Sequence, residues 1–89
     1  MKHAGPAALD ALADLLQEIR RCPGLREPKR GTFYRKSSAF LHFHEDPAGF
    51  FADLKIGDTF RRFPVNTAAQ RRALVQRIAR LASDGCKPS

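Results

Sequence analysis

The stretch from residue 33 to residue 65 constrains the fold most strongly, because apolar and polar residues alternate along two of its segments. In residues 39–44 (AFLHFH), one set of alternate positions is entirely apolar, and the other holds a phenylalanine and two histidines. In residues 51–56 (FADLKI), one set is again apolar, and the other holds Phe, Asp and Lys. Successive side chains of a β-strand point to opposite faces, so these segments predict two strands with a shared apolar face and a mixed second face.

Turn residues divide the same stretch into four expected strands. Lys36-Ser37-Ser38 forms the first turn, the segment 45–49 (EDPAG) forms a loop, and Gly57-Asp58 has the length and composition of a two-residue hairpin turn. The expected strands are residues 33–36, 39–44, 51–56 and 59–65.

Two amphipathic helices are expected at the two ends of this stretch. In residues 6–21, Leu and Ile recur every three or four positions after Pro6, and Pro23-Gly24 ends the pattern. The second helix begins at residue 67 with a capping box in which Thr67 and Gln70 exchange hydrogen bonds, and Gly85 is its expected C-terminal stop. The segment 25–31 (LREPKRG) lacks an apolar pattern and is expected to be a loop.

The element order α-β-β-β-β-α predicts an α+β fold. It consists of a four-stranded antiparallel meander with both helices on its apolar face. The 89 residues are enough for one domain with one modest core, so residues 1–89 are expected to form a single domain. Residues 1–5 and 86–89 are expected to be disordered.

Charge and cysteine content set the expected environment. The formal net charge is +7, from 16 Lys and Arg against 9 Asp and Glu, which favours attraction to polyanions. Asp10 and Asp14 interrupt any signal-peptide core, and no segment approaches the ~20 apolar residues of a membrane span. Cys22 and Cys86 lack metal-site spacing and are expected to be free thiols in the cytoplasm, with a single bridge between them left open. We expect no binding to membranes.

The mixed face is the expected functional surface. Matching the faces of neighbouring strands places Phe40 opposite Lys55, His42 opposite Asp53, His44 opposite Phe51, Asp53 opposite Arg62 and Lys55 opposite Phe60. The residues predicted on this open face are Phe40, His42, His44, Phe51, Asp53, Lys55, Phe60 and Arg62.

Burial between two chains is the first interpretation of this face. An open sheet face with several phenylalanines is an exposed apolar patch, and such patches are typical of interfaces. Small domains gain stability from association, and closed homodimers are the commonest assembly. The sequence therefore predicts a small basic binding or interaction module that forms a homodimer.

Nucleic-acid binding is the alternative interpretation. Aromatic side chains can stack on bases while neighbouring cations contact phosphates. The second helix adds four positive charges and has no acid between residues 67 and 82. The candidate polyanion-binding residues on this helix are Arg71, Arg72, Arg77 and Arg80.

A metal site and catalysis are the remaining interpretations. His42 and His44 point the same way from one strand, and Glu45, Asp46 or Asp53 could supply an oxygen ligand. Two histidines are too few for a convincing site, so no metal or other cofactor is expected. His42 with Asp53 is half of a general-base pair, but no catalytic motif is present. We therefore expect no enzymatic activity, and the sequence identifies no small-molecule substrate.

Part of the chain resembles known proteins. Residues 34–55 (YRKSSAFLHFHEDPAGFFADLK) resemble short, uncharacterised bacterial proteins that share an F-x-H-F-H-E-D core and have no assigned activity. Residues 22–27 (CPGLRE), followed by Gly31 and the strand that holds Phe40, are similar to a P-G-V-x-E segment of the MmcQ/YjbR-like proteins. That resemblance implies an α+β fold and nucleic-acid binding, and it assigns no functional residue here.

Overall fold

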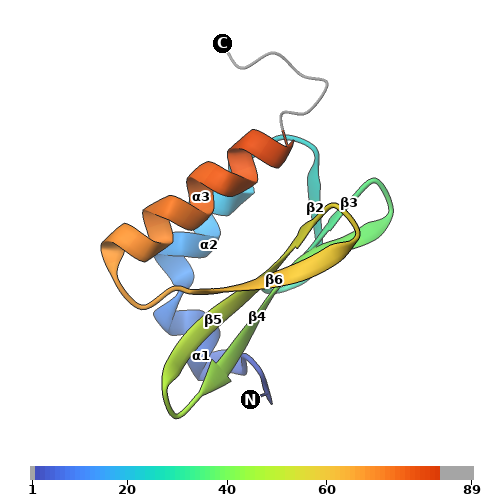
Figure 1. The fold of residues 1–89 in the computed structure, drawn as a ribbon. Helices are drawn as coiled ribbons and strands as arrows, with labels where there is room; N and C mark the ends of the chain where they lie inside the picture. Colours follow the sequence, from blue (N-terminus) through green and yellow to red (C-terminus); the bar gives the residue numbers. More distant parts are fainter. Residues whose placement is uncertain (1, 83–89) are drawn as a thin grey trace.

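The computed structural model describes residues 2–82, in which helices at both ends of the chain cover one face of an antiparallel sheet (Figure 1). The α+β class is therefore confirmed, but the sheet has six strands rather than the four expected. In chain order the elements are β1 (Lys2–His3), α1 (Pro6–Ala11), α2 (Ala13–Arg20), β2 (Leu25–Lys29), β3 (Thr32–Arg35), β4 (Ser38–Asp46), β5 (Gly49–Ile56), β6 (Thr59–Pro64) and α3 (Ala68–Ala82).

The strands β2 to β6 lie in sequence order, and β1 is added beside β4. β5 pairs with one edge of β4. On the other edge of β4, β3 pairs with the first half of the strand and β1 pairs with the second half. The expected pairings of His42 with Asp53 and of Asp53 with Arg62 are confirmed. β4 and β5 extend to Asp46 and Gly49, so a two-residue turn replaces the loop expected over residues 45–49.

The segment 25–31 was expected to be a loop, and most of it forms the edge strand β2. Its anchor is Glu27, which accepts hydrogen bonds from the Arg20 guanidinium at 2.7 and 3.1 Å and from the Gly31 N–H at 2.9 Å. Pro28 is tolerated because an edge strand has backbone groups without a strand partner. Polar contacts stabilise this strand in place of alternating apolar residues. The sequence therefore has no apolar pattern from which β2 could be predicted.

The core lies between the sheet and the helices. The expected helix over residues 6–21 is divided at Leu12, whose side chain is fully buried, into α1 and α2. The capping box of α3 is confirmed, because the Gln70 N–H donates to Thr67 Oγ1 and the Thr67 N–H donates to Gln70 Oε1, both at 3.1 Å. The largest fully buried side chains are those of Leu12, Leu16, Ile19, Phe33, Leu41, Leu54, Val65, Leu74 and Ile78.

Residues 2–5 lie beside β4 and form hydrogen bonds with it, while the disorder expected for residues 1–5 stays a prediction. The Ala4 N–H donates to the Phe43 carbonyl at 3.0 Å, and the Gly5 N–H donates to Glu45 Oε2 at 2.7 Å. The expected helix stop at Gly85, the expected disorder of residues 86–89 and the expected free thiol of Cys86 all concern residues outside the described range. Within residues 2–82, the helices are all too short or too polar to cross a membrane.

The β3–β4 turn offers a test of the fold. Lys36 and Ser37 have positive φ angles of 53° and 68°, a region that costs a residue with a side chain about 1–2 kcal/mol. Ser37→Gly should therefore raise the free energy of unfolding, by about 0.5–1 kcal/mol after the extra freedom of glycine in the unfolded chain is counted. Urea denaturation measures this change. The matched Ser38→Gly variant changes a residue inside β4 and should be destabilised. A loss of stability in Ser37→Gly would contradict the positive φ angle of Ser37.

Candidate metal centre: a histidine cluster on the open sheet face

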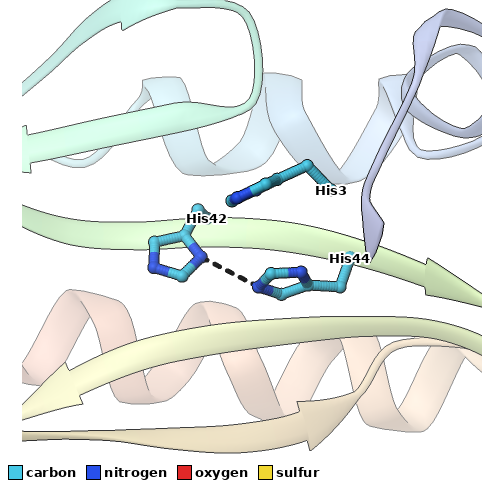
Figure 2. A group of neighbouring side chains, drawn as sticks. All are labelled: His3, His42 and His44. Atoms are coloured by element: carbon cyan, nitrogen blue, oxygen red, sulfur yellow. Dashed lines mark hydrogen bonds between the residues drawn. The ribbon is translucent and has the colours of Figure 1, made fainter. Parts of the chain in front are cut away.

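All three histidines of the chain meet on the open face, which is the side of the sheet away from the helices (Figure 2). His42 and His44 are two positions apart in β4 and so point to the same side. His3 lies in β1, directly across from His44. One ring nitrogen from each histidine lies within 4.8 Å of those of the other two.

His3 is placed there by contacts far apart in the sequence. Besides the pairing of β1 with β4, the Glu45 carboxylate accepts the Gly5 N–H across 40 positions of chain. Glu45 was expected in a solvated loop, but it lies in β4 and secures the start of the chain. The sequence pattern does not indicate His3 as a site residue, because a two-residue strand has no detectable alternation.

The three rings contact one another. Nδ1 of His42 and Nε2 of His44 are 3.1 Å apart, a hydrogen bond that needs one ring to donate and the other to accept. The His3 ring centroid lies 4.8 Å from that of His44 and 5.8 Å from that of His42, and in Figure 2 the ring of His3 extends toward His42. Burial lowers the pKa of His42, the nearby Asp53 charge opposes this, and the charges of His44, His3 and Arg62 reinforce it. The neutral ring, which is the metal-binding form, is thereby favoured.

Asp53 supports the cluster from β5. Its carboxylate is 8% exposed and accepts two hydrogen bonds from the Arg62 guanidinium, at 2.8 and 2.9 Å. The Arg62 hydrogen bonds hold the pKa of Asp53 below its usual range, although burial acts in the opposite direction. Oδ2 of Asp53 also lies 3.1 Å from Nε2 of His44. The carboxylate thus contacts His44, and not His42 as the hypothesis of a general-base pair required.

The apolar part of the open face is smaller than the sequence predicted. Phe40 is 5% exposed and belongs to the core, so its placement on the open face is wrong. The cause is a bulge: Phe33 pairs with Leu41 and Tyr34 with Ala39, so Phe40 is an extra residue that interrupts the alternation of β4. Two other residues of the predicted face, Phe51 and Lys55, are half-buried.

Phe60 carries most of the remaining apolar exposure. It is 42% exposed and is the one large hydrophobic side chain of residues 2–82 that is classed as exposed. Its ring centroid lies 5.0 Å from that of His42, so it borders the histidine cluster. Homodimer formation through this face stays a prediction.

The four arginines of α3 do not form one surface. Arg71 donates from Nε to the Val65 carbonyl at 2.8 Å, and the Arg77 guanidinium lies 4.8 Å from the centroid of the Phe63 ring. Arg72 lines a cleft between α2 and α3 together with acidic residues, and Arg80 lines a separate pocket at the end of the helix. At least two of the four arginines therefore have structural contacts inside the chain.

Cys22, the one cysteine of the described range, is a free thiol with partial burial. Burial raises the pKa of this thiol, which reduces the fraction of the nucleophilic thiolate at neutral pH. This property is consistent with a structural side chain.

Comparisons of the chain with models of protein families, with curated proteins and with solved structures find no match. The resemblance to short bacterial proteins and to the MmcQ/YjbR-like proteins stays a prediction. The function is therefore inferred from the geometry of the site.

Asp53 gives a prediction of pH dependence. Its pKa is lowered in the folded chain, so its contribution to stability is complete above the unfolded pKa of about 3.9 and is lost as pH falls through the lower folded value. In metal-free buffer, Asp53→Asn should reduce the free energy of unfolding by about 1–3 kcal/mol at pH 7, because buried hydrogen bonds to a charged group are lost. The difference from wild type should shrink below about pH 4.

Urea denaturation from pH 3 to pH 7 measures this dependence. Asp58→Asn, in the exposed β5–β6 turn, is the matched control and should change stability little at any pH. A difference between wild type and Asp53→Asn that stays constant down to pH 3 would contradict the role of the Asp53 charge.

Proposed function

We propose that this chain is a small metal-binding module in which His3, His42 and His44 hold one transition-metal ion on the open sheet face. The observation that carries the proposal is the meeting of every histidine of the chain at one point, with ligand atoms within 4.8 Å of one another. Imidazole nitrogen is a preferred ligand of Zn²⁺, Cu²⁺ and Ni²⁺.

The spacing of the donors supports this function. Metal–nitrogen bonds of about 2.0–2.1 Å in a tetrahedral site place neighbouring ligand atoms roughly 3.3 Å apart. The 3.1 Å separation of His42 Nδ1 and His44 Nε2 is already close to this value. The largest separation between two ligand atoms of the cluster is at most 4.8 Å, and a movement of one ring by about 1.5 Å brings it to the distance of a tetrahedral site. Rotation of the His3 side chain on the short strand β1 supplies such a movement.

The surroundings of the cluster supply the rest of the site. Asp53 Oδ2 lies 3.1 Å from His44 Nε2 and can act as an oxygen ligand or orient a bound water. Arg62 holds this carboxylate in place and offsets its negative charge. The ion is thus bound mainly by neutral nitrogen donors, which favours a borderline metal such as Zn²⁺ over Mg²⁺ or Ca²⁺.

Metal binding ranks above the two functions that the sequence favoured. Burial of Phe40 removes part of the apolar area on which homodimer formation was based. The contacts of Arg71 and Arg77 inside the chain divide the proposed polyanion surface of α3. The histidine cluster, by contrast, gains His3 as a third ligand.

The test is calorimetric titration of Zn²⁺, with Co²⁺ absorption as a reporter of coordination geometry. The protein carries no histidine tag, and Cys22→Ser with Cys86→Ser removes the thiols as competing ligands. We expect one ion per chain and binding at least about tenfold weaker in each of His3→Gln, His42→Gln and His44→Gln, because each change removes a direct ligand.

His3→Gln is the decisive variant, since it separates a three-histidine site from a simple H-x-H pair. Glu18→Gln, which changes an exposed acid of α2, is the control and should bind Zn²⁺ like the parent. Unchanged affinity in His3→Gln and His42→Gln would overturn the proposal.

A further inference from the structure

A groove lies between α2 and α3, in the helical layer that covers the face of the sheet opposite the histidine cluster (Figure 1). Its volume is about 300 Å³, at the lower end of the usual range of small-molecule sites. At 3.6 residues per turn, its lining residues fall on one face of each helix. They include Asp14, Leu15 and Glu18 of α2 and Ala68, Arg72 and Val75 of α3.

The floor of the groove is apolar. Leu15 is 3% exposed and belongs to the core, and Val75 is partly buried against the same core. Ala68, at the start of α3, adds only a methyl group to the lining. An apolar group that enters this groove leaves water and contacts these side chains, which favours its binding.

The two walls of the groove carry opposite charges. Asp14 and Glu18 are exposed acids one turn apart on α2, and Arg72 is an exposed cation on α3. Among the described residues, no ion pair joins the two walls. Glu18 pairs with Arg21 of its own helix at 3.4 Å, and this exposed contact is of the weak kind. The facing charges are thus available to a ligand.

A ligand of one charge alone fits this groove poorly. An anion at Arg72 lies near the acids of α2, and a cation at those acids lies near Arg72, so one wall repels each of them. Arg71 adds to the positive wall, where its Nε donates to the Val65 carbonyl at 2.8 Å and holds the guanidinium in place. A molecule with one positive and one negative group is attracted by both walls.

We propose that this groove binds a small zwitterion with an apolar side chain, of the class of leucine and phenylalanine. The apolar side chain packs on Leu15 and Val75. The ammonium group pairs with Asp14 and Glu18, and the carboxylate pairs with Arg72, whose guanidinium matches carboxylate geometry. The groove contains none of the proposed metal ligands, so this proposal is independent of the metal site.

The test is titration of the isotope-labelled protein with L-leucine, followed through amide NMR shifts. EDTA keeps metal out of the histidine cluster, and ~50 mM NaCl limits charge screening. Leucinamide lacks the carboxylate, isocaproate lacks the ammonium group, and glycine lacks the apolar side chain. We expect leucine to shift the amides of Leu15 and Val75 with a dissociation constant on the order of 1 mM. Each analogue should bind at least about threefold more weakly, because it lacks one partly exposed interaction.

Single variants test each wall against a matched control. Arg72→Gln and Asp14→Asn should each weaken leucine binding at least about threefold. Arg61→Gln in β6 and Asp58→Asn in the β5–β6 turn change exposed residues outside the groove and should leave binding almost unchanged. Arg72→Gln should not weaken the binding of leucinamide, which has no carboxylate for Arg72 to bind.

The titration of the unaltered protein can overturn the proposal without any variant. Unshifted amides of Leu15 and Val75 at ~20 mM leucine would do so, since a millimolar site is then almost saturated. Equal binding of leucine and isocaproate would contradict recognition of the ammonium group. Shifts of the same amides on raising the protein concentration without leucine would show that a second copy of the chain covers the groove. Equal effects of the groove variants and their controls would reduce the binding to general charge and also overturn the proposal.

Discussion

The pairing of β4 with its neighbours is the interaction on which the rest of the structure depends. β4 is the longest strand, with nine residues, and it forms backbone ladders with β1, β3 and β5. Its inward side chains Leu41 and Phe43 enter the core, while His42 and His44 face outward. The same ladder that fixes the core therefore fixes the spacing of the histidines, so the site is built on a rigid element.

Charge pairing on the open face determines what the histidine cluster can bind. On the open face, Asp53 binds Arg62, and burial lowers the pKa of His42, which favours the neutral form of that ring. The pairing of Asp53 with Arg62 leaves nitrogen as the main donor atom of the proposed metal site, which suits a borderline transition-metal cation.

The sequence predicted the parts of the fold that depend on local patterns. Alternation in β4 and β5 located both strands and most of the open face, and the Gly57-Asp58 turn set the register that pairs Asp53 with Arg62. Three features depend on interactions that alternation does not encode. β2 is stabilised by polar contacts of Glu27, a bulge turns Phe40 into the core, and His3 reaches the site through pairing with residues some 40 positions away.

The two outer strands limit how other molecules can approach the sheet. β2 and β6 lie at opposite ends of the strand order, and each contains a proline, Pro28 in one and Pro64 in the other. Each also contains two cationic residues. Proline removes a backbone donor, and positive charge repels a second copy of the same edge, so both features discourage the addition of a foreign strand. The two edges of the sheet thus oppose edge-to-edge growth into aggregates, and its open face is left as the side on which another molecule can contact the strands.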